Sequence, residues 1–287
     1  MTRRDAEGLS PSGRRVKVSL NAGWLFEKQS RGIGELGSYE RRRGRESETE
    51  RIFVGAEQLE YDDSCWERVD IPHCWNAHDV MTAQSGYWRG IGWYRKTFRL
   101  GEQWSEKRVR LQFEGVNQRV TLWLNGRVLG SHKGGYTPFE FDITEHLNPL
   151  GEVNILAARV DNLYDPDMPP TVKTDINFVG GIYRDVRLEG TYPIHVSSVW
   201  VQSSKLDHKK AVIVAKTVVA NNSSATRVVQ VLHKVFDGDG NAVCSFSGEH
   251  ELVANELGEF EHRLQTVSNP RLWSPESPHL YRLLTQV

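Results

Sequence analysis

The chain has 287 residues and a formal net charge of −1. A nearly neutral chain has no net field that would attract nucleic acid or an anionic membrane, so neither is expected as a partner. No apolar run is long enough to cross a bilayer and no signal peptide follows Met1, which predicts a cytoplasmic protein. A periplasmic or secreted protein with a trimmed N-terminus would look the same.

The first predicted strand lies within residues 16–26 and ends in the aromatic pair Trp24 and Phe26. Residues 27–62 then break the pattern, because they are rich in glycine and charge and contain few residues that could anchor a core. This composition predicts a long surface loop. Arginines 41–43 could form a basic patch, but the glutamates interleaved around them favour a solvated, self-neutralising run.

Aromatic residues become dense from Trp66 onward, as is typical of strands. A hairpin is predicted at Asn125-Gly126, because both residues tolerate the positive φ angles of a type I′ turn. No segment has a convincing amphipathic helical pattern. The sequence therefore predicts an all-β, jelly-roll β-sandwich as domain one, residues 1–191. Its alternating runs predict strands at 92–100, 108–113, 120–124, 127–129, 136–143, 153–160 and 186–188.

The composition changes after Pro193, where aromatic residues thin out and valine dominates. Turn sequences at 221–224 and 237–241 have roughly the spacing of an immunoglobulin-like sandwich, which has about 100 residues. Residues 192–287 are therefore predicted to form an immunoglobulin-like β-sandwich. It could lack its final strand, because residues 280–287 still read as β where the chain stops.

Three cysteines, Cys65, Cys74 and Cys244, show no spacing typical of metal ligands. An odd number favours free thiols of a reducing compartment, with a Cys65–Cys74 disulfide as the minor alternative. His73, His78 and Asp79 could suggest a metal site, but the proline, tryptophan and asparagine among them favour an irregular turn. Neither a metal nor a cofactor is expected.

Six motifs, in their order and spacing, carry a family resemblance. They are Ile71-Pro72-His73-Cys74-Trp75-Asn76, Gly90-Ile91-Gly92-Trp93-Tyr94-Arg95-Lys96, Gly115-Val116-Asn117, Trp123-Leu124-Asn125-Gly126, Gly134-Gly135-Tyr136-Thr137-Pro138-Phe139 and Gly180-Gly181-Ile182-Tyr183-Arg184-Asp185-Val186. With them, the chain resembles the N-terminal region of glycoside hydrolase family 2 enzymes, most closely β-galactosidases. The resemblance covers nearly the whole chain and implies a sugar-binding jelly roll followed by an immunoglobulin-like domain.

The resemblance also implies that catalysis lies outside these residues. In such enzymes a (β/α)₈ barrel carries the two catalytic glutamates, and a barrel needs about 250 residues that this chain does not supply. We therefore expect a non-catalytic fragment of a retaining exo-β-glycosidase, with a β-galactoside as substrate and the missing barrel as partner in cis. A homo-oligomer, a β-glucuronidase or β-mannosidase parent, and a stand-alone carbohydrate-binding module remain open.

Asp175 is the first candidate substrate-binding residue, because relatives place an aspartate of this loop at the rim of the sugar pocket. An ionised carboxylate only accepts hydrogen bonds and can hold two sugar hydroxyls at once. Arg89 and Trp88 are the other candidates, since their loop approaches the same pocket in relatives, some of which use asparagine there. A guanidinium could donate to hydroxyls and an aromatic ring could stack on a sugar face; packing is the alternative for Trp88 and its neighbour Tyr87.

Arg184 and Asp185 are adjacent, and on a predicted strand they would face opposite sides of the sheet. This argues against a mutual catalytic pair and favours structural hydrogen bonding for both.

Overall fold

The computed structural model describes residues 15–29, 55–79, 88–163, 165, 167–169, 179–204, 206–264 and 266–287. The chain divides into two compact units, Met1–Gly190 and Thr191–Val287. Residues 30–54 of the predicted surface loop, and the candidate residue Asp175, lie outside the described residues. Among the described residues, no helix has the length and apolar character needed to cross a lipid bilayer.

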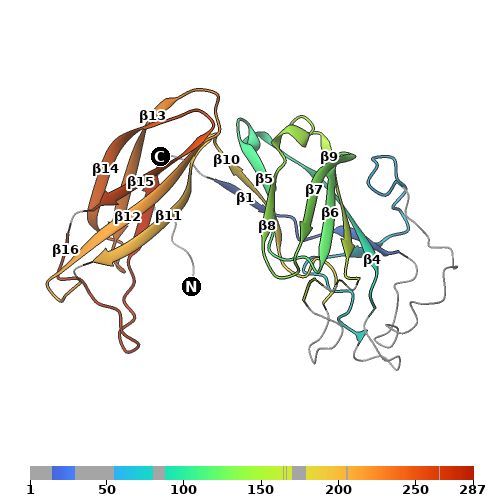
Figure 1. The fold of residues 1–287 in the computed structure, drawn as a ribbon, viewed down its shortest axis with the longest axis horizontal. Helices are drawn as coiled ribbons and strands as arrows, with labels where there is room; N and C mark the ends of the chain where they lie inside the picture. The colour runs from blue at the N-terminus through green and yellow to red at the C-terminus, as the bar shows by residue number, and fades with distance from the viewer. Residues whose placement is uncertain are drawn as a thin grey trace. The chain divides into compact units, whose positions relative to one another are not determined.

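The first unit is a sandwich of two β-sheets, as predicted (Figure 1). The larger sheet has six strands in the order β3-β2-β4-β9-β6-β7, and the smaller has four in the order β1-β10-β5-β8. The strands are β1 (Val16–Ser19), β2 (Trp24–Lys28), β3 (Glu67–Val69), β4 (Ile91–Arg99), β5 (Arg108–Phe113), β6 (Arg119–Leu124), β7 (Arg127–Lys133), β8 (Phe139–Asp142), β9 (Val153–Asp161) and β10 (Val186–Thr191).

Alternation along the strands builds the core between these sheets. In β5 the buried residues are Val109, Leu111 and Phe113, and in β6 they are every second residue from Val120 to Leu124. Successive side chains of a strand point to opposite faces, so each strand gives one apolar face to the core and one polar face to the outside.

The hairpin between β6 and β7 forms as the sequence predicts. Asn125 has φ 53° and Gly126 has φ 76°, as a type I′ turn requires. The Asn125 side chain also donates to the carbonyl of His146 at 2.8 Å and accepts from the N–H of Ile155 at 2.9 Å. The turn is therefore tied to the neighbouring chain as well as being locally favoured.

Three local predictions were wrong. The run 16–26 holds two strands instead of one, because Asn21–Gly23 interrupt it: Gly23 has φ 69° and donates to Asp70 Oδ1 at 2.6 Å. Two short 3₁₀ helices occur among the described residues, Glu102–Trp104 and Thr144–His146, so Trp104, one of the aromatic residues after Trp66 that were expected on strands, is not on one. Arg184 and Asp185 precede β10 and are not on a strand either.

The outer face of the six-stranded sheet is covered at one end by the turns of residues 55–66. Trp93 of β4 stacks on Trp123 of β6 with 5.4 Å between ring centroids, and Ala56 and Trp66 complete this small apolar cluster. Arg95 is 2% exposed; it donates to Asp63 Oδ2 at 2.7 Å and to the carbonyl of Gln58 at 2.9 Å. These contacts fix the covering segment to the sheet.

The second unit is also a β-sandwich. One sheet has the order β11-β12-β15, with β16 pairing β12, and the other has the order β14-β13-β17. The strands are β11 (Ile194–Ser204), β12 (Lys210–Asn221), β13 (Arg227–Phe236), β14 (Ala242–Leu252), β15 (Glu256–Arg263), β16 (Val267–Ser268) and β17 (Arg282–Gln286). Its core is mainly valine, alanine and leucine, in accordance with the valine-rich sequence.

Candidate functional site

A buried polar network holds the segment that carries Trp88 and Arg89. The Asn162 side chain accepts from the N–H of Gly90 at 2.8 Å and donates to the carbonyl of Trp88 at 3.2 Å. The Asn76 side chain donates to the same carbonyl at 2.9 Å, and Asp79 Oδ2 accepts from the N–H of Trp88 at 2.8 Å. These side chains supply hydrogen-bond partners for the N–H and carbonyl of Trp88 and for the N–H of Gly90, just before the start of β4.

Trp88 is partly buried and makes contacts on two sides. Its ring meets Trp75 edge to face, with 5.3 Å between centroids and an interplanar angle of 87°, and Lys28 Nζ lies 5.0 Å from its centroid. A cation over an aromatic face is attracted by the ring's quadrupole. These contacts hold Trp88 in place beside Arg89, which is also partly buried.

The segment that was predicted to carry Asp175 in a loop lies between Asn162 and Gly180, and the structure describes residues 162, 163, 165, 167–169, 179 and 180 of it. The N–H of Trp75 donates to the carbonyl of Gly180 at 3.1 Å, and a Cβ at Gly180 would lie 2.1 Å from Trp75 Nε1 and 2.5 Å from Asn162 Nδ2. Only glycine fits such a close approach. The Gly180 end of this segment therefore meets Trp75 and Asn162, the residues that hold Trp88 and Gly90, and its other end begins at Asn162.

Aromatic side chains pack against the ends of this segment. His73 Nδ1 lies 2.8 Å from the Tyr94 hydroxyl, and the imidazole tautomer decides which of the two donates. Burial lowers the pKa of His73, and burial raises the pKa of Tyr94 well above its usual value. A neutral imidazole hydrogen-bonded to tyrosine serves packing here. Within the described part of the chain, no group of three His, Cys, Asp or Glu side chains could hold a metal ion.

The remaining residues singled out from the sequence lie in structural roles. Arg184 Nη1 donates to the carbonyl of Tyr136 at 3.2 Å, and Asp185 Oδ1 accepts from Asn21 at 3.0 Å. Cys65 and Cys74 are free thiols, as is Cys244, whose pKa is raised by burial.

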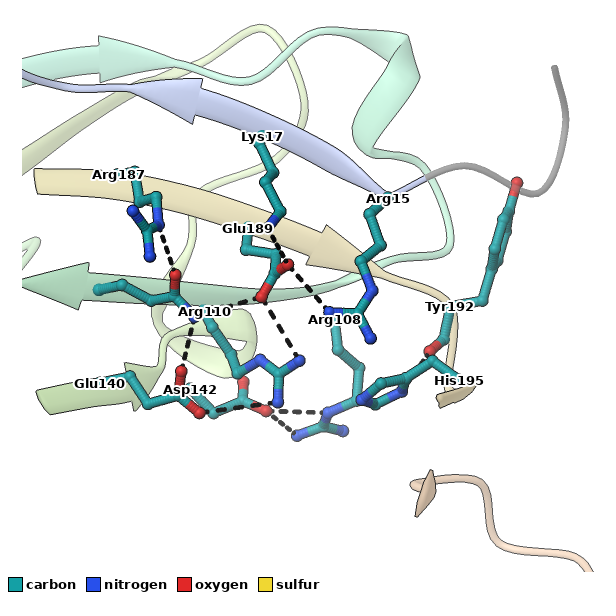
Figure 2. Close-up of polar contacts among 11 residues, drawn as sticks. Arg15, Lys17, Arg108, Arg110, Glu140, Asp142, Arg187, Glu189, Tyr192 and His195 are labelled. Carbon is teal, nitrogen blue, oxygen red and sulfur yellow. Dashed lines mark hydrogen bonds and ion pairs between the residues drawn. The ribbon is translucent and has the colours of Figure 1, made fainter. Parts of the chain in front are cut away.

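The outer face of the four-stranded sheet carries a charged cluster that sequence reasoning missed. Glu189 of β10 is 4% exposed, and its carboxylate lies 3.1 Å from Arg15, 3.2 Å from Lys17 and 3.7 Å from Arg110 (Figure 2). Burial alone would raise the pKa of Glu189, but Lys17 and Arg15 outweigh it and hold the pKa below its usual value. The alternating charges of 108–112 were a signal for this face.

Figure 2 also shows that the cations of this face have partners close by. Arg108 binds Asp142 Oδ2 through two nitrogens at 2.8 and 2.9 Å, and Arg187 Nε donates to Gln112 Oε1 at 2.8 Å. Tight mutual pairing of this kind stabilises a sheet and leaves little charge for a ligand. We therefore assign this face to the scaffold. The candidate site is the Trp88–Gly90 segment together with the ends of the Asp175 segment.

Comparison with known families decides where this architecture belongs. A model described as the sugar binding domain of glycosyl hydrolases family 2 matches residues 18–193, and a second model of glycosyl hydrolases family 2 matches residues 194–287. The chain belongs to glycosyl hydrolase family 2. This confirms the resemblance, and the two successive matches agree with a jelly roll followed by an immunoglobulin-like sandwich.

Relatives within family 2 carry two activities in their names. A β-galactosidase of Bacteroides ovatus is 34% identical over 81% of this chain, and a β-glucuronidase of Bacteroides fragilis is 34% identical over 75% of it. The crystal structure of a Bacteroides uniformis β-glucuronidase matches 95% of this chain with a TM-score of 0.77 and 29% identity.

The family 2 relatives are much longer than the residues they share with this chain. The chain spans 27% of the B. ovatus protein, 32% of the B. fragilis protein and 30% of the B. uniformis structure.

Proposed function

We propose that this chain is the non-catalytic N-terminal part of a retaining exo-β-glycosidase. The observation that carries the proposal is the succession of two family 2 domains in a chain that spans about a third of its relatives. Retaining hydrolysis needs two carboxyl groups about 5 Å apart across the scissile bond. In this proposal a barrel in the same protein supplies them, and the present domains shape the rim of its sugar pocket.

Asp175 and Arg89 are the residues proposed to reach the sugar. An aspartate carboxylate accepts hydrogen bonds from two hydroxyls, and a guanidinium donates from a planar fork. The shared anchoring of both loop ends on Trp75 and Asn162 supports their acting at one place. Trp88 would support Arg89 through its packing against Trp75 and could present its remaining ring surface to the sugar.

The substrate is proposed to be a terminal β-linked sugar, either a β-galactoside or a β-glucuronide. The motifs favour a galactoside, whereas relatives of similar identity carry both names. The two substrates differ in the group on C5 of the sugar, a hydroxymethyl in the galactoside and a carboxylate in the glucuronide, and in the configuration of the C4 hydroxyl. Hydrolysis rates of 4-nitrophenyl β-galactoside and β-glucuronide by the full-length protein would decide between them.

The test of the proposal uses the full-length protein and Asp175→Ala. We expect kcat/KM to fall by at least about tenfold for the preferred glycoside, because a direct contact with the sugar is removed. Glu140→Ala, on the outer face of the four-stranded sheet, is the matched control and should leave kcat/KM unchanged. A folded full-length protein without β-glycosidase activity would refute the parent activity, and unchanged kinetics would refute only the role of Asp175.

A stand-alone carbohydrate-binding module is the second candidate, favoured by the sugar-binding description of the family model. It predicts that these 287 residues bind a galactoside or glucuronide without a barrel. Calorimetry on the isolated chain measures this. A lack of heat with both sugars would count against a self-sufficient module.

A further inference from the structure

A cavity of about 340 Å³ lies on the outer face of the six-stranded sheet, over β6, β7 and β9. The register pairs Arg119 with both Asp161 and Lys133 in one row across these strands. The next row on the same face holds Thr121, paired with both Arg159 and Ser131. Directly paired residues share a face, so all six side chains belong to one surface. Its volume falls at the lower end of the range of small-ligand sites, roughly 300–1,000 Å³.

The cavity lies next to the segment that covers another part of this face. Residues 55–66 pack over the Trp93–Trp123 pair, which lies further along the same strands. Within the described part of the chain, the rows at Arg119 and Thr121 lie beside that cover and line the cavity. The walls of the cavity are polar and apolar in equal measure, whereas the covered part is apolar.

Among the described residues, the ion-paired charges at the cavity leave an excess of one positive charge. Three cations, Arg119, Lys133 and Arg159, face two carboxylates, Asp161 and Asp165. Both arginines share Asp161 at long range: the distances to its Oδ2 are 3.3 Å from Arg119 Nη2 and 4.0 Å from Arg159 Nη1. Close charge-assisted hydrogen bonds are about 2.7–2.9 Å long, so neither guanidinium is fully engaged by this carboxylate.

Arg119 provides a second sign of incomplete pairing. Its Nε is buried, and among the described residues it has no hydrogen-bond partner. Buried donors are nearly always satisfied, so the hydrogen bonding of this guanidinium is incomplete. Arg108 on the four-stranded sheet is different, because two of its nitrogens bind Asp142 at 2.8 and 2.9 Å.

We propose that this cavity binds an anionic sugar residue, with its carboxylate or sulfate held by Arg119 and Arg159. Guanidinium groups match these planar or multi-oxygen anions through paired N–H donors. The hydroxyls of Thr121 and Ser131 donate to and accept from ring hydroxyls, and Asp161 accepts from them. This accessory site goes beyond the proposed function, because it is formed entirely by one sheet face of the first unit.

Binding to the 287-residue protein tests the proposal. We expect methyl β-D-glucuronide to bind at least about tenfold more tightly than methyl β-D-glucoside, which has a neutral hydroxymethyl group in place of the carboxylate, with an affinity that weakens as salt is added. Methyl β-D-galactoside 6-sulfate and methyl β-D-galactoside form the sulfate arm, and the tighter charged sugar identifies the preferred anion. Equal binding within both pairs, or none, overturns the proposal. Inorganic sulfate binding as tightly as the charged sugars overturns it too, since it would show a simple anion site.

Variants locate the binding. Arg159→Gln and Lys133→Gln should each weaken binding of the charged sugar by about fivefold or more, and Thr121→Val should weaken it without changing the salt dependence. Arg108→Gln removes a cation from the other sheet and should have no effect. Circular dichroism verifies that each variant is folded. Equal affinities of Arg159→Gln and Arg108→Gln would overturn the assignment. Asp175→Ala should leave this binding intact. A failure of the accessory-site proposal can therefore be told apart from a failure of the proposed glycosidase function.

Discussion

At Asn162, one buried amide side chain joins both loop ends of the candidate site. Its oxygen accepts from Gly90, and its nitrogen donates to the Trp88 carbonyl and to Asn76 Oδ1, both at 3.2 Å. No other residue type has a donor and an acceptor in this arrangement except glutamine, which is one methylene longer. The position of Trp88 and Arg89 therefore depends on a residue that is only 4% exposed.

Asn162→Ala should lower the free energy of unfolding by about 2 kcal/mol, because it leaves the buried N–H of Gly90 without its acceptor. Urea unfolding followed by tryptophan fluorescence measures this. Asn222→Ala, in an exposed turn, is the control, and its effect should be within about 0.5 kcal/mol. Equal stabilities of the two variants would show that the network does not hold the segment.

At the scale of the elements, a row of three histidines crosses the interior of the second unit. His262 of β15 lies between two partners: its Nδ1 is 2.9 Å from His233 Nε2, and its Nε2 is 2.7 Å from His250 Nε2. His233 Nδ1 lies 2.9 Å from the Thr285 hydroxyl, and Thr217 and Phe246 pack around the same ring. Neutral imidazoles can satisfy this row, each donating to the next.

The row predicts a dependence of stability on pH. Burial, and then the nearby His262, lower the pKa of His233 from 6.5 to about 4, and burial with His250 lowers the pKa of His262. In the unfolded chain the imidazole of His233 binds a proton as the pH falls through about 6.5, whereas in the folded chain it stays neutral until the pH approaches 4. The stabilisation is therefore complete above about pH 6.5 and is lost as the pH falls toward 4.

His233→Gln should flatten this dependence. Between pH 7 and pH 4.5 the wild-type protein should lose on the order of 2 kcal/mol more than the variant. Urea unfolding monitored by hydrogen exchange of β13 measures the difference in the second unit alone. Parallel pH profiles for the two proteins would contradict a role for His233.

The strands of both units were largely predictable, because period-two alternation and turn residues are local properties of the sequence. The hairpin at Asn125-Gly126 is the clearest case. The break at Gly23 was missed because it depends on Asp70, which is far away in the sequence. The same holds for the site: Trp88 and Arg89 could be named from motifs, but their link to Asn162 could not, since 74 residues separate Trp88 from Asn162.

At the scale of the whole molecule, each unit has its own core. The first is centred on residues such as Trp24, Phe113 and Leu122, and the second on Val219, Val231 and Leu252. About 100 residues are enough for an immunoglobulin-like sandwich to fold independently.

We therefore expect residues 191–287, produced alone, to unfold cooperatively with a β-sheet circular dichroism spectrum. Calorimetry of the complete chain should then contain a transition at the temperature measured for this fragment. The variant Val231→Ala should lower the melting temperature of the fragment, because it opens a cavity in the core. A fragment without a cooperative transition would show that the second unit depends on the first.

The edge-to-face contact between Trp75 and Trp88 has a use in experiment. Two indoles held 5.3 Å apart at 87° couple their electronic transitions and contribute to the circular dichroism of the near and far ultraviolet. The contribution disappears in Trp88→Phe, so a difference spectrum isolates it. The protein thus carries a built-in optical probe at the end of the loop where the sugar is proposed to bind, and a ligand that moves this loop can be followed without a label.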